Sequence, residues 1–297
     1  MSPPCIILTY TFLVAAAKAQ QTPDFDKTDT PAVVWPDWMS SLPDGKSLAD
    51  IAMPGTHDSM AFYGGAIAQC QSWPLLKQYE AGIRFVDIRC RHYENFLPIH
   101  HGVIYQRADY ADVLQDTICF LQDHPLETIL MRVKEEHTAF NNTRTFKETV
   151  TLYMEEAGSQ WFLRTSTVPT LGEARGKIII LQNFNPPSNP LGILYPGNFR
   201  ISDDYEVTDA NKKWKVVESH ITTAFRGDPQ TTYITYVSGS HWLLFTPAAL
   251  AKKLNPQLFS FLEREVVGRT RSGGVIIMDF PGAELVQHII RSNWEFQ

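Results

Sequence analysis

Ionisable side chains follow or end short apolar runs at five places in the chain. They are His57 and Asp58 after 48–53, Asp87 and Arg89 at the end of 83–89, His100 and His101 after 97–99, Lys134 after 129–133, and Asp279 after 275–278. Two histidines, each with an ordinary pKa of about 6.5, can act as base and acid at neutral pH. Arginine and lysine together can hold a phosphate and offset charge that develops on its oxygens. The set suits cleavage of a phosphodiester by an internal hydroxyl group.

Each member also has a purely structural interpretation. A histidine at a strand end is commonly a hydrogen-bonded structural residue, Asp87 and Arg89 could form a plain ion pair, Lys134 could lie in a solvated loop, and Asp279 could cap a helix. Their joint placement favours a site. A catalytic metal is disfavoured because Arg89 would put a fixed cation where the ion would sit, and the chain has no His-Glu-x-x-His or His-x-His pattern. It also lacks the Gly-x-Ser-x-Gly turn of many serine hydrolases.

Apolar runs alternate with amphipathic stretches from residue 47 onward. We expect strands at 48–53, 83–89, 96–100, 128–133, 177–183, 231–237 and 275–278, and helices at 74–81, 110–123, 145–157, 209–225, 256–267 and 284–291. This alternation predicts parallel strand–helix units and an α/β fold, a single distorted (β/α)8-type (TIM-like) barrel. A doubly wound open sheet is the alternative, but its glycine-rich phosphate loop is missing. In a barrel the ionisable residues would converge on one mouth, at the carboxyl ends of the strands.

Composition excludes several classes of protein. The 297 residues are 44% hydrophobic and 20% charged, which is ordinary for a globular chain and argues against fibrous or disordered structure. With 26 basic against 32 acidic residues, the net charge is −6, so nucleic acid is not an expected partner. After the N-terminus there is no run of apolar residues long enough to predict a membrane span.

The first 19 residues are typical of a secretory signal peptide. Residues 5–17 are almost wholly apolar but too short to span a bilayer, and Ala17-Lys18-Ala19 offers small residues for cleavage. A buried N-terminal helix is the alternative. We expect a secreted, extracellular protein with a loosely ordered N-terminal arm at 20–44 and a catalytic barrel at 45–297.

Two features matter in that compartment. Asn141 begins an Asn-Asn-Thr sequon, so we expect a glycan there. Once Cys5 is removed with the signal, Cys70, Cys90 and Cys119 remain, which allows at most one internal disulfide. The spacing does not choose the pair.

Residues 46–137 resemble the catalytic X region of phosphatidylinositol-specific phospholipase C, in the small secreted form best known from bacteria. The matching stretches are 53–59 (Met-Pro-Gly-Thr-His-Asp-Ser), 82–89 (Gly-Ile-Arg-Phe-Val-Asp-Ile-Arg), 100–102 (His-His-Gly) and 127–135 (Glu-Thr-Ile-Leu-Met-Arg-Val-Lys-Glu). The C-terminal half matches more thinly, at 174–177, 202–205, 238–239 with Trp242, and the strand that ends in Asp279. The resemblance covers most of 45–285 and implies a distorted, incompletely closed barrel.

The resemblance implies acid–base roles for four residues. His57 would be the general base that takes the proton of the inositol 2-hydroxyl, and Asp279 would orient and stabilise its imidazole. His101, helped by Asp58, would protonate the diacylglycerol oxygen as it leaves. The implied products are diacylglycerol and inositol 1,2-cyclic phosphate.

Charge and headgroup contacts follow from the same resemblance. Arg89, held by Asp87, would contact the phosphate and supply the positive charge that calcium supplies in the large intracellular relatives, so neither a metal nor another cofactor is expected. Lys134 would lie near the phosphate or the sugar hydroxyls, and Asp203 would bind sugar hydroxyls. Tyr205 would stack on the ring.

One position departs from the family. The family's strand after Lys177 carries an arginine that helps to bind the headgroup, whereas this chain has Asn183 there, so its headgroup contact lacks a charge.

An apolar loop is expected beside the mouth. In the loop at 240–245, Trp242, Leu243 and Phe245 could enter a lipid interface, or half of the loop could pack as strand and core. A weaker candidate lies at 63–67.

The sequence therefore predicts a metal-independent phospholipase C that is monomeric and acts on phosphatidylinositol in membranes, with GPI-anchored proteins as a further source of the headgroup. The alternatives are a metal-dependent lipid phosphodiesterase on a similar barrel and a catalytically inactive lipid-binding relative. Loss of activity in a chelator would favour the first alternative, and retention of both His57 and His101 argues against the second.

Overall fold

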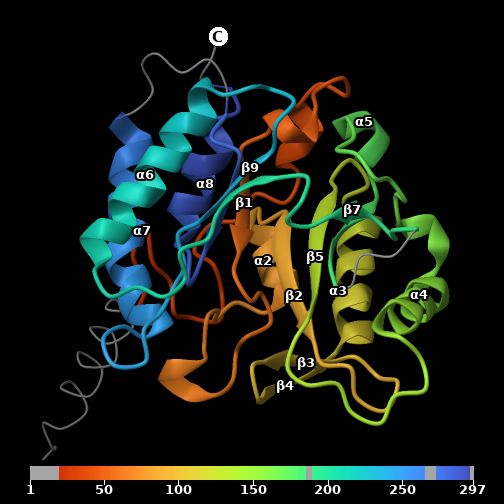
Figure 1. The fold of residues 1–297 in the computed structure, drawn as a ribbon. Helices are drawn as coiled ribbons and strands as arrows, with labels where there is room; N and C mark the ends of the chain where they lie inside the picture. Colours follow the sequence, from red (N-terminus) through yellow and green to blue (C-terminus); the bar gives the residue numbers. More distant parts are fainter. Residues whose placement is uncertain (1–19, 185–188, 265–271, 295–297) are drawn as a thin grey trace, which may run out of the picture.

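Eight parallel strands form a curled sheet at the centre of the molecule (Figure 1). The computed structural model describes residues 20–184, 189–264 and 272–294. The strand order is β7-β6-β5-β2-β1-β10-β9-β8, and within the described residues no pairing joins β7 to β8, so the barrel is incompletely closed. The predicted TIM-like α/β barrel is confirmed. The strands are β1 (Met53–Thr56), β2 (Phe85–Cys90), β5 (Ile129–Glu135), β6 (Ile178–Asn183), β7 (Ile193–Leu194), β8 (Arg200–Ser202), β9 (Tyr233–Tyr236) and β10 (Val275–Met278).

Helices cover the outside of this sheet, with α6, α7 and α8 on one side and α2, α3 and α4 on the other (Figure 1). Several begin where the sequence predicts because a polar side chain caps the first turn, as Asp109, Thr145 and Asp209 do by accepting backbone N–H bonds. The helices are α2 (Leu75–Ala81), α3 (Tyr110–Asp123), α4 (Phe146–Ala157), α5 (Leu171–Ala174), α6 (Ala210–Arg226), α7 (Pro247–Arg264) and α8 (Ala283–Arg291), with short 3-10 turns η1 (Trp38–Ser41), η2 (Leu48–Asp50), η3 (Gly65–Ile67) and η4 (Ser159–Trp161).

Two strand predictions are wrong. The run at 48–53 begins with the turn η2, because the Ser47 side chain accepts the N–H of Ala49, and the strand starts only at Met53. The run at 96–100 is not a parallel barrel strand. It becomes β3 (Pro98–His101), which pairs antiparallel with β2 and forms a hairpin with β4 (Ile104–Asp109).

The helix predicted at 256–267 also differs. It starts at Pro247 and carries Pro256 inside it, so a proline that the sequence favours as a helix start does not mark one here. The predicted residues 265–267 lie outside the described part of the chain. The short edge strands β7 and β8 have no signal in the sequence pattern.

The N-terminal arm is packed rather than loosely ordered. Trp38, Met39 and Leu42 are at most 4% exposed and join the main hydrophobic core at the amino ends of the strands. Beneath them, the fully buried Arg84 and Glu127 form an ion pair of 2.8 Å, and Glu127 also accepts backbone N–H bonds from the arm. This part of the arm therefore covers the end of the barrel opposite the predicted mouth, while residues 24–26 pair with 280–282, beyond the carboxyl end of β10. Within the described residues, no helix is long and apolar enough to cross a membrane.

Candidate active site

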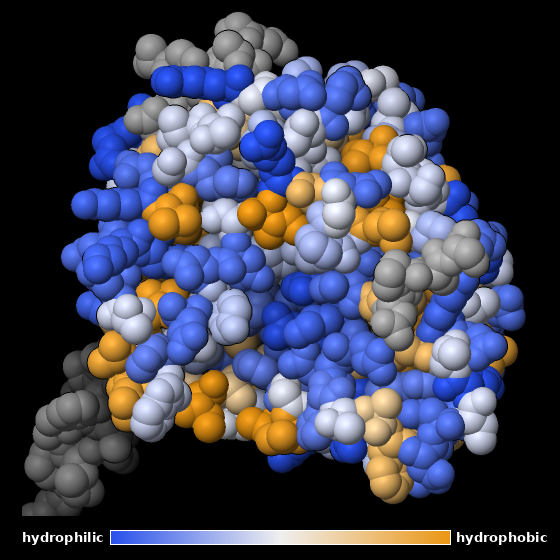
Figure 2. All heavy atoms as spheres, viewed as in Figure 1, coloured by the Kyte–Doolittle hydropathy of each residue, from blue (hydrophilic) through white to orange (hydrophobic). Residues whose placement is uncertain are grey.

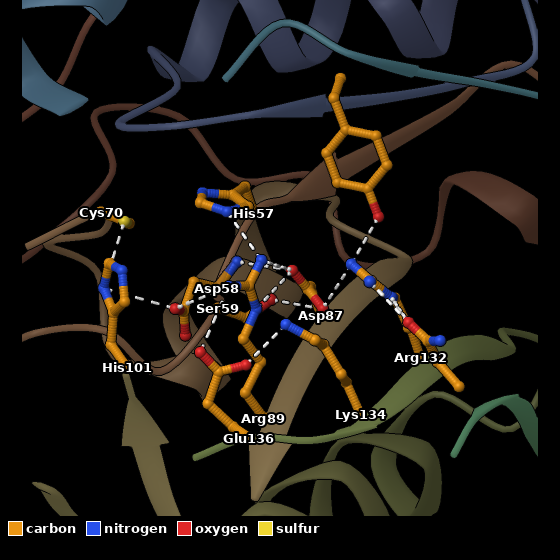
Figure 3. A network of polar contacts seen from close by, with 12 residues as sticks. His57, Asp58, Ser59, Cys70, Asp87, Arg89, His101, Arg132, Lys134 and Glu136 are labelled. Atoms are coloured by element: carbon orange, nitrogen blue, oxygen red, sulfur yellow. Dashed lines mark hydrogen bonds and ion pairs between the residues drawn. The ribbon is translucent and has the colours of Figure 1, made fainter. Parts of the chain in front are cut away.

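A cavity of about 420 Å³ opens at the carboxyl ends of the strands. This is the size of a small-molecule site. It gathers six of the predicted site residues, and Figure 3 shows how the side chains from β1, β2, β3 and β5 point toward one another. The lining residues are His57, Cys70, Arg89, His101, Arg132, Lys134, Asp203, Tyr205, Gly239, Ser240 and Pro247.

Strand geometry explains why the charged residues of β2 and β5 meet. Side chains two residues apart on a strand share a face, and the parallel register places Asp87 beside Arg132 and Arg89 beside Lys134. All four therefore belong to the inner face of the barrel. The buried Asp87 accepts bonds from both arginines, at 2.9 Å from Arg89 and 3.1 Å from Arg132. Although burial opposes ionisation, the two guanidinium groups hold the pKa of Asp87 well below its usual range.

His57 lies between a carboxylate and a guanidinium. Its Nδ1 is 2.9 Å from Asp279 Oδ1, and its Nε2 is 2.8 Å from Arg89 Nη2. Because Arg89 can only donate, Nε2 must accept and Nδ1 carries the proton that Asp279 accepts. Burial disfavours the imidazolium, but Asp279 outweighs it and the pKa of His57 is raised above its ordinary value.

The turn that carries His57 is fixed by its neighbours. Asp58 adopts a left-handed conformation with φ 41°, and its backbone N–H donates to Asp87 at 3.1 Å. The Gln71 amide donates to the carbonyls of His57 and Met278, at 2.8 and 3.0 Å. These bonds tie the ends of β1, β2 and β10 together and set the direction of the imidazole.

His101 comes from the β3–β4 hairpin, and it faces Asp58 and Cys70. Its Nδ1 lies 2.7 Å from the Ala68 carbonyl, 3.4 Å from Asp58 Oδ2 and 3.9 Å from Cys70 Sγ. Asp58 is fully buried, and burial raises the pKa of its carboxyl. The antiparallel hairpin thus delivers this histidine to the mouth, although its strand is not a barrel strand.

Arg132 is a cavity residue that the sequence reasoning missed. It donates to Asn183 Oδ1 through Nε and Nη2, at 2.9 and 2.6 Å, and to Tyr236 through Nη1 at 2.9 Å. Its guanidinium also lies 4.6 Å from the centre of the Tyr195 ring. Asn183 is thus placed behind Arg132 and is not among the lining residues. Arg132 lies two residues before Lys134 on the same strand, so the two side chains share a face, and this spacing could have identified Arg132 as a cavity residue.

Glu136 is a second missed residue. Its carboxylate accepts Lys134 Nζ at 2.7 Å and the Gly102 N–H at 3.1 Å, and it lies 3.9 Å from Arg89. Although burial opposes ionisation, Arg89 and Lys134 lower the pKa of Glu136. This carboxylate joins β5 to the hairpin that carries His101.

Exposed apolar residues lie beside the cavity. Trp242, Leu243 and Leu244 are 82, 67 and 55% exposed, while Phe245 is half-buried against the core. Ile67 of η3, 72% exposed, lines the same hollow as this loop. Figure 2 shows hydrophobic side chains gathered along the lower edge of this face, below a polar central hollow. Three of the six residues in the loop predicted at 240–245 are therefore exposed, and the other three are half-buried.

The cysteines, the sequon and the signal peptide are the remaining features that the sequence predicts. Cys70, Cys90 and Cys119 are all free thiols in the described chain, the first two buried and the third exposed. Asn141 is exposed in its loop, as a glycan would need. The predicted signal peptide lies outside the described residues.

Comparison with known proteins points in one direction. Residues 54–184 match the family described as phosphatidylinositol-specific phospholipase C, X domain. A relative from Listeria monocytogenes named 1-phosphatidylinositol phosphodiesterase is 32% identical, over 97% of this chain and 95% of the relative. One of the same name from Staphylococcus aureus is 27% identical, over 86% of this chain and 93% of the relative.

Solved structures agree with these relatives. The phosphatidylinositol-specific phospholipase C of Listeria monocytogenes superposes with a TM-score of 0.77 at 32% identity, over 88% of this chain and 99% of that one. A Staphylococcus aureus phosphatidylinositol-specific phospholipase C gives a TM-score of 0.77 at 27% identity, over 86% of this chain and 97% of that one.

Proposed function

This chain belongs to the phosphatidylinositol-specific phospholipase C family and is an enzyme of that kind, and we propose that it converts phosphatidylinositol to diacylglycerol and inositol 1,2-cyclic phosphate without a metal ion. One observation carries the proposal. The unprotonated Nε2 of His57, the Arg89 guanidinium and His101 all face one cavity, each supported from behind by a buried carboxylate.

His57 and His101 divide the proton transfers. His57 Nε2 takes the proton of the inositol 2-hydroxyl while that oxygen attacks phosphorus, and Asp279 stabilises the imidazolium that forms. As the bond from phosphorus to the glycerol oxygen breaks, His101 gives that oxygen a proton. Asp58 Oδ2 lies 3.4 Å from His101 Nδ1 and helps to orient the ring for this step.

Arg89 supplies the positive charge at the phosphate. Its side chain is 12% exposed and is held by Asp87, so it is already in place before substrate arrives. A guanidinium held there stabilises charge on the phosphate oxygens, and the Arg89 N–H that is bonded to His57 Nε2 leaves that atom when the inositol hydroxyl takes its place. Burial disfavours the cation, but Asp87 and Asp58 outweigh it and raise the pKa of Arg89 above its already high value, which keeps it charged at every working pH.

Arg132 takes the place of the missing headgroup arginine. It lies one strand away from Asn183, in the register position opposite Asp87, and lines the cavity with Lys134, Asp203 and Tyr205. Asn183 acts as its hydrogen-bond acceptor. We propose that these four residues bind the inositol ring, with Tyr205, 68% exposed, stacked on its face.

We further propose that this activity takes place at a membrane surface outside the cell; the exposed apolar loop and the predicted signal peptide support this. Trp242 and Leu243 would enter the lipid interface, where aromatic and aliphatic side chains are favoured. Secretion by the signal at 1–19 would expose the enzyme to free phosphatidylinositol and to GPI-anchored proteins, on which it would act as a monomer.

A single assay tests the central claim. Diacylglycerol release from phosphatidylinositol vesicles is measured in excess EDTA for the parent, for His57→Ala, and for His124→Ala as a control histidine paired with Asp37 at the other end of the barrel. We expect release by the parent and the control and none by His57→Ala. Activity that needs added calcium would overturn the role of Arg89 and favour a metal-dependent phosphodiesterase. No diacylglycerol release by the parent, either in EDTA or with added calcium, would favour an inactive lipid-binding relative.

A further inference from the structure

Cys70 is a fixed thiol inside the catalytic cavity that the proposed reaction does not use. It is 0% exposed, yet it is among the residues that line the cavity. Its backbone is bonded on both sides, because its N–H donates to Ala61 O at 2.9 Å and its carbonyl accepts the Phe280 N–H at 3.1 Å. The sulfur is therefore held in place between the loops that follow β1 and β10.

This sulfur completes two sets of potential metal ligands. One consists of Asp58, Cys70 and His101 and the other of His57, Cys70 and Asp279, and in each set the ligand atoms lie within 4.8 Å of one another. In the second set His57 and Asp279 already bond each other.

In the set formed by Asp58, Cys70 and His101, the carboxylate oxygens of Asp58 are free to bind a ligand. Asp58 is fully buried, and neither of its oxygens accepts a hydrogen bond from any described residue. Its nearest basic nitrogens are His101 Nδ1 at 3.4 Å and Arg89 Nη1 at 3.6 Å. A buried carboxylate without hydrogen bonds is costly to keep, so a ligand that binds it is favoured.

We propose that Asp58, Cys70 and His101 form an inhibitory site for a soft divalent cation, with zinc the best fit. Thiolate, imidazole and carboxylate are the ligands that zinc takes in proteins, and three of them leave a fourth position for water. Calcium and magnesium prefer oxygen ligands and would gain only one carboxylate here, whereas the thiolate and imidazole let zinc outweigh the repulsion from Arg89 that any divalent ion meets. The site therefore selects zinc by ligand type.

Zinc binding to these three residues releases a proton from the thiol and leaves the bound ion neutralised. Without metal the thiol is protonated, because burial and the neighbouring carboxylates hold the pKa of Cys70 well above its ordinary value. Zinc binding breaks the S–H bond and releases that proton to solvent, after which thiolate and carboxylate neutralise the ion. Where Nδ1 of His101 is the ligand atom, it gives up its bond to the Ala68 carbonyl and its proton passes through solvent to Nε2, so the ring binds zinc as a neutral imidazole. Inhibition follows because the metal occupies His101, which protonates the leaving oxygen, and Asp58, which supports His101.

Cobalt and zinc test the site directly, in metal-free buffer with a reductant that is not a thiol. Cobalt added to the parent should produce the charge-transfer absorption of a cobalt–thiolate bond, and zinc should displace it. Zinc should also abolish phosphatidylinositol cleavage at concentrations where calcium and magnesium have no effect, and EDTA should restore it. Because the absorption needs no turnover, it reports on the site even if the proposed activity fails.

Two cysteine variants and one histidine variant decide the outcome. Cys70→Ser should lose the cobalt absorption and need more than about tenfold more zinc for half-inhibition, the lower end of the loss seen even for residues that only support a metal ligand. Cys119→Ser, which removes the exposed thiol of α3, should behave as the parent does. If Cys70→Ser does not fold, His101→Gln keeps the thiol and removes another ligand, and its cobalt affinity should fall. Absence of the absorption in the parent, or unchanged zinc sensitivity in folded Cys70→Ser, would overturn the proposal.

Discussion

Replacing Arg132 by methionine tests whether the headgroup cation has moved from one strand to the next. Methionine keeps much of the side chain's length and removes its charge and all five of its N–H groups. Four of those groups donate to Asn183, Asp87 and Tyr236. One Nη2 N–H remains that no described residue accepts, and the residue lines the cavity. A hydroxyl of the inositol ring is its expected acceptor.

The size of the effect follows from that one bond. A hydrogen bond to a charged group contributes about 1.5–3 kcal/mol, and each 1.4 kcal/mol or so is a factor of ten in affinity. Arg132→Met should therefore weaken headgroup binding by about 10- to 100-fold. The protein should also lose about 1–3 kcal/mol of stability, because the buried Asp87 Oδ1 loses the donor that Arg132 provides.

The assay separates binding from stability and from chemistry. The inhibition constant of free myo-inositol is measured for the parent, for Arg132→Met and for Tyr195→Phe, together with the thermal unfolding midpoint of each. Tyr195→Phe keeps the ring against Arg132 and removes the hydroxyl that contacts Tyr236 at 2.8 Å, so it should lower the midpoint slightly and leave the inhibition constant unchanged. An inhibition constant within twofold of the parent in a folded Arg132→Met would refute the reasoning.

Two further predictions concern the base and the membrane. In Asp279→Asn, His57 loses the carboxylate that raises its pKa, so the acid limb of the kcat/KM profile should move to lower pH. The value of kcat should fall toward the loss of about 10⁴-fold known for the same change beside another catalytic histidine. An acid limb at the same pH as in the parent would contradict the pairing of Asp279 with His57. In the double variant Trp242→Ala/Leu243→Ala, vesicle binding in a sedimentation assay should fall by about tenfold or more, since each side chain contributes about 1.5–3 kcal/mol when buried, whereas cleavage of a dispersed short-chain substrate should persist. The exposed Val34→Ala in the N-terminal arm is the matched control, and equal vesicle binding by all three proteins would exclude the loop as the contact.

The helices were predictable because their signals are local. The bounds of α3 are those that the amphipathic pattern predicts, and α2, α4, α6 and α8 agree to within one residue at each end. The apolar pattern predicted the wrong structure where a local cap or the pairing between strands outweighs the strand preference of the residues. Residues 48–50 are as apolar as a strand but turn under the Ser47 cap, and 98–101 pair with β2 in the antiparallel direction. Nothing in a short apolar run states the direction of its partner.

The arm shows a second limit of composition. Residues 20–44 are rich in Pro, Asp and Thr, which is typical of a loose segment, yet Trp38 and Met39 are buried. The buried Glu127 accepts the N–H groups of Met39 and Ser40 from 87 or more residues away. Such a contact has no signature in the local sequence.

By itself the sequence determined that His57, Arg89 and Asp279 share a mouth, because polar residues at the carboxyl ends of parallel strands must lie together whatever the packing between them. His101 reaches the same mouth from an antiparallel hairpin, which the sequence pattern did not predict. Only the tertiary structure decided which side chains are hydrogen-bond or contact partners within the site. The register of β2 on β5 places Arg132 against Asp87, the next strand gives Arg132 an amide acceptor where the resemblance led us to expect a guanidinium, and the loop after β1 brings the Cys70 thiol to 3.9 Å from His101. Register and loop closure depend on contacts between distant segments, so these assignments came from the fold and not from the spacing of residues along the chain.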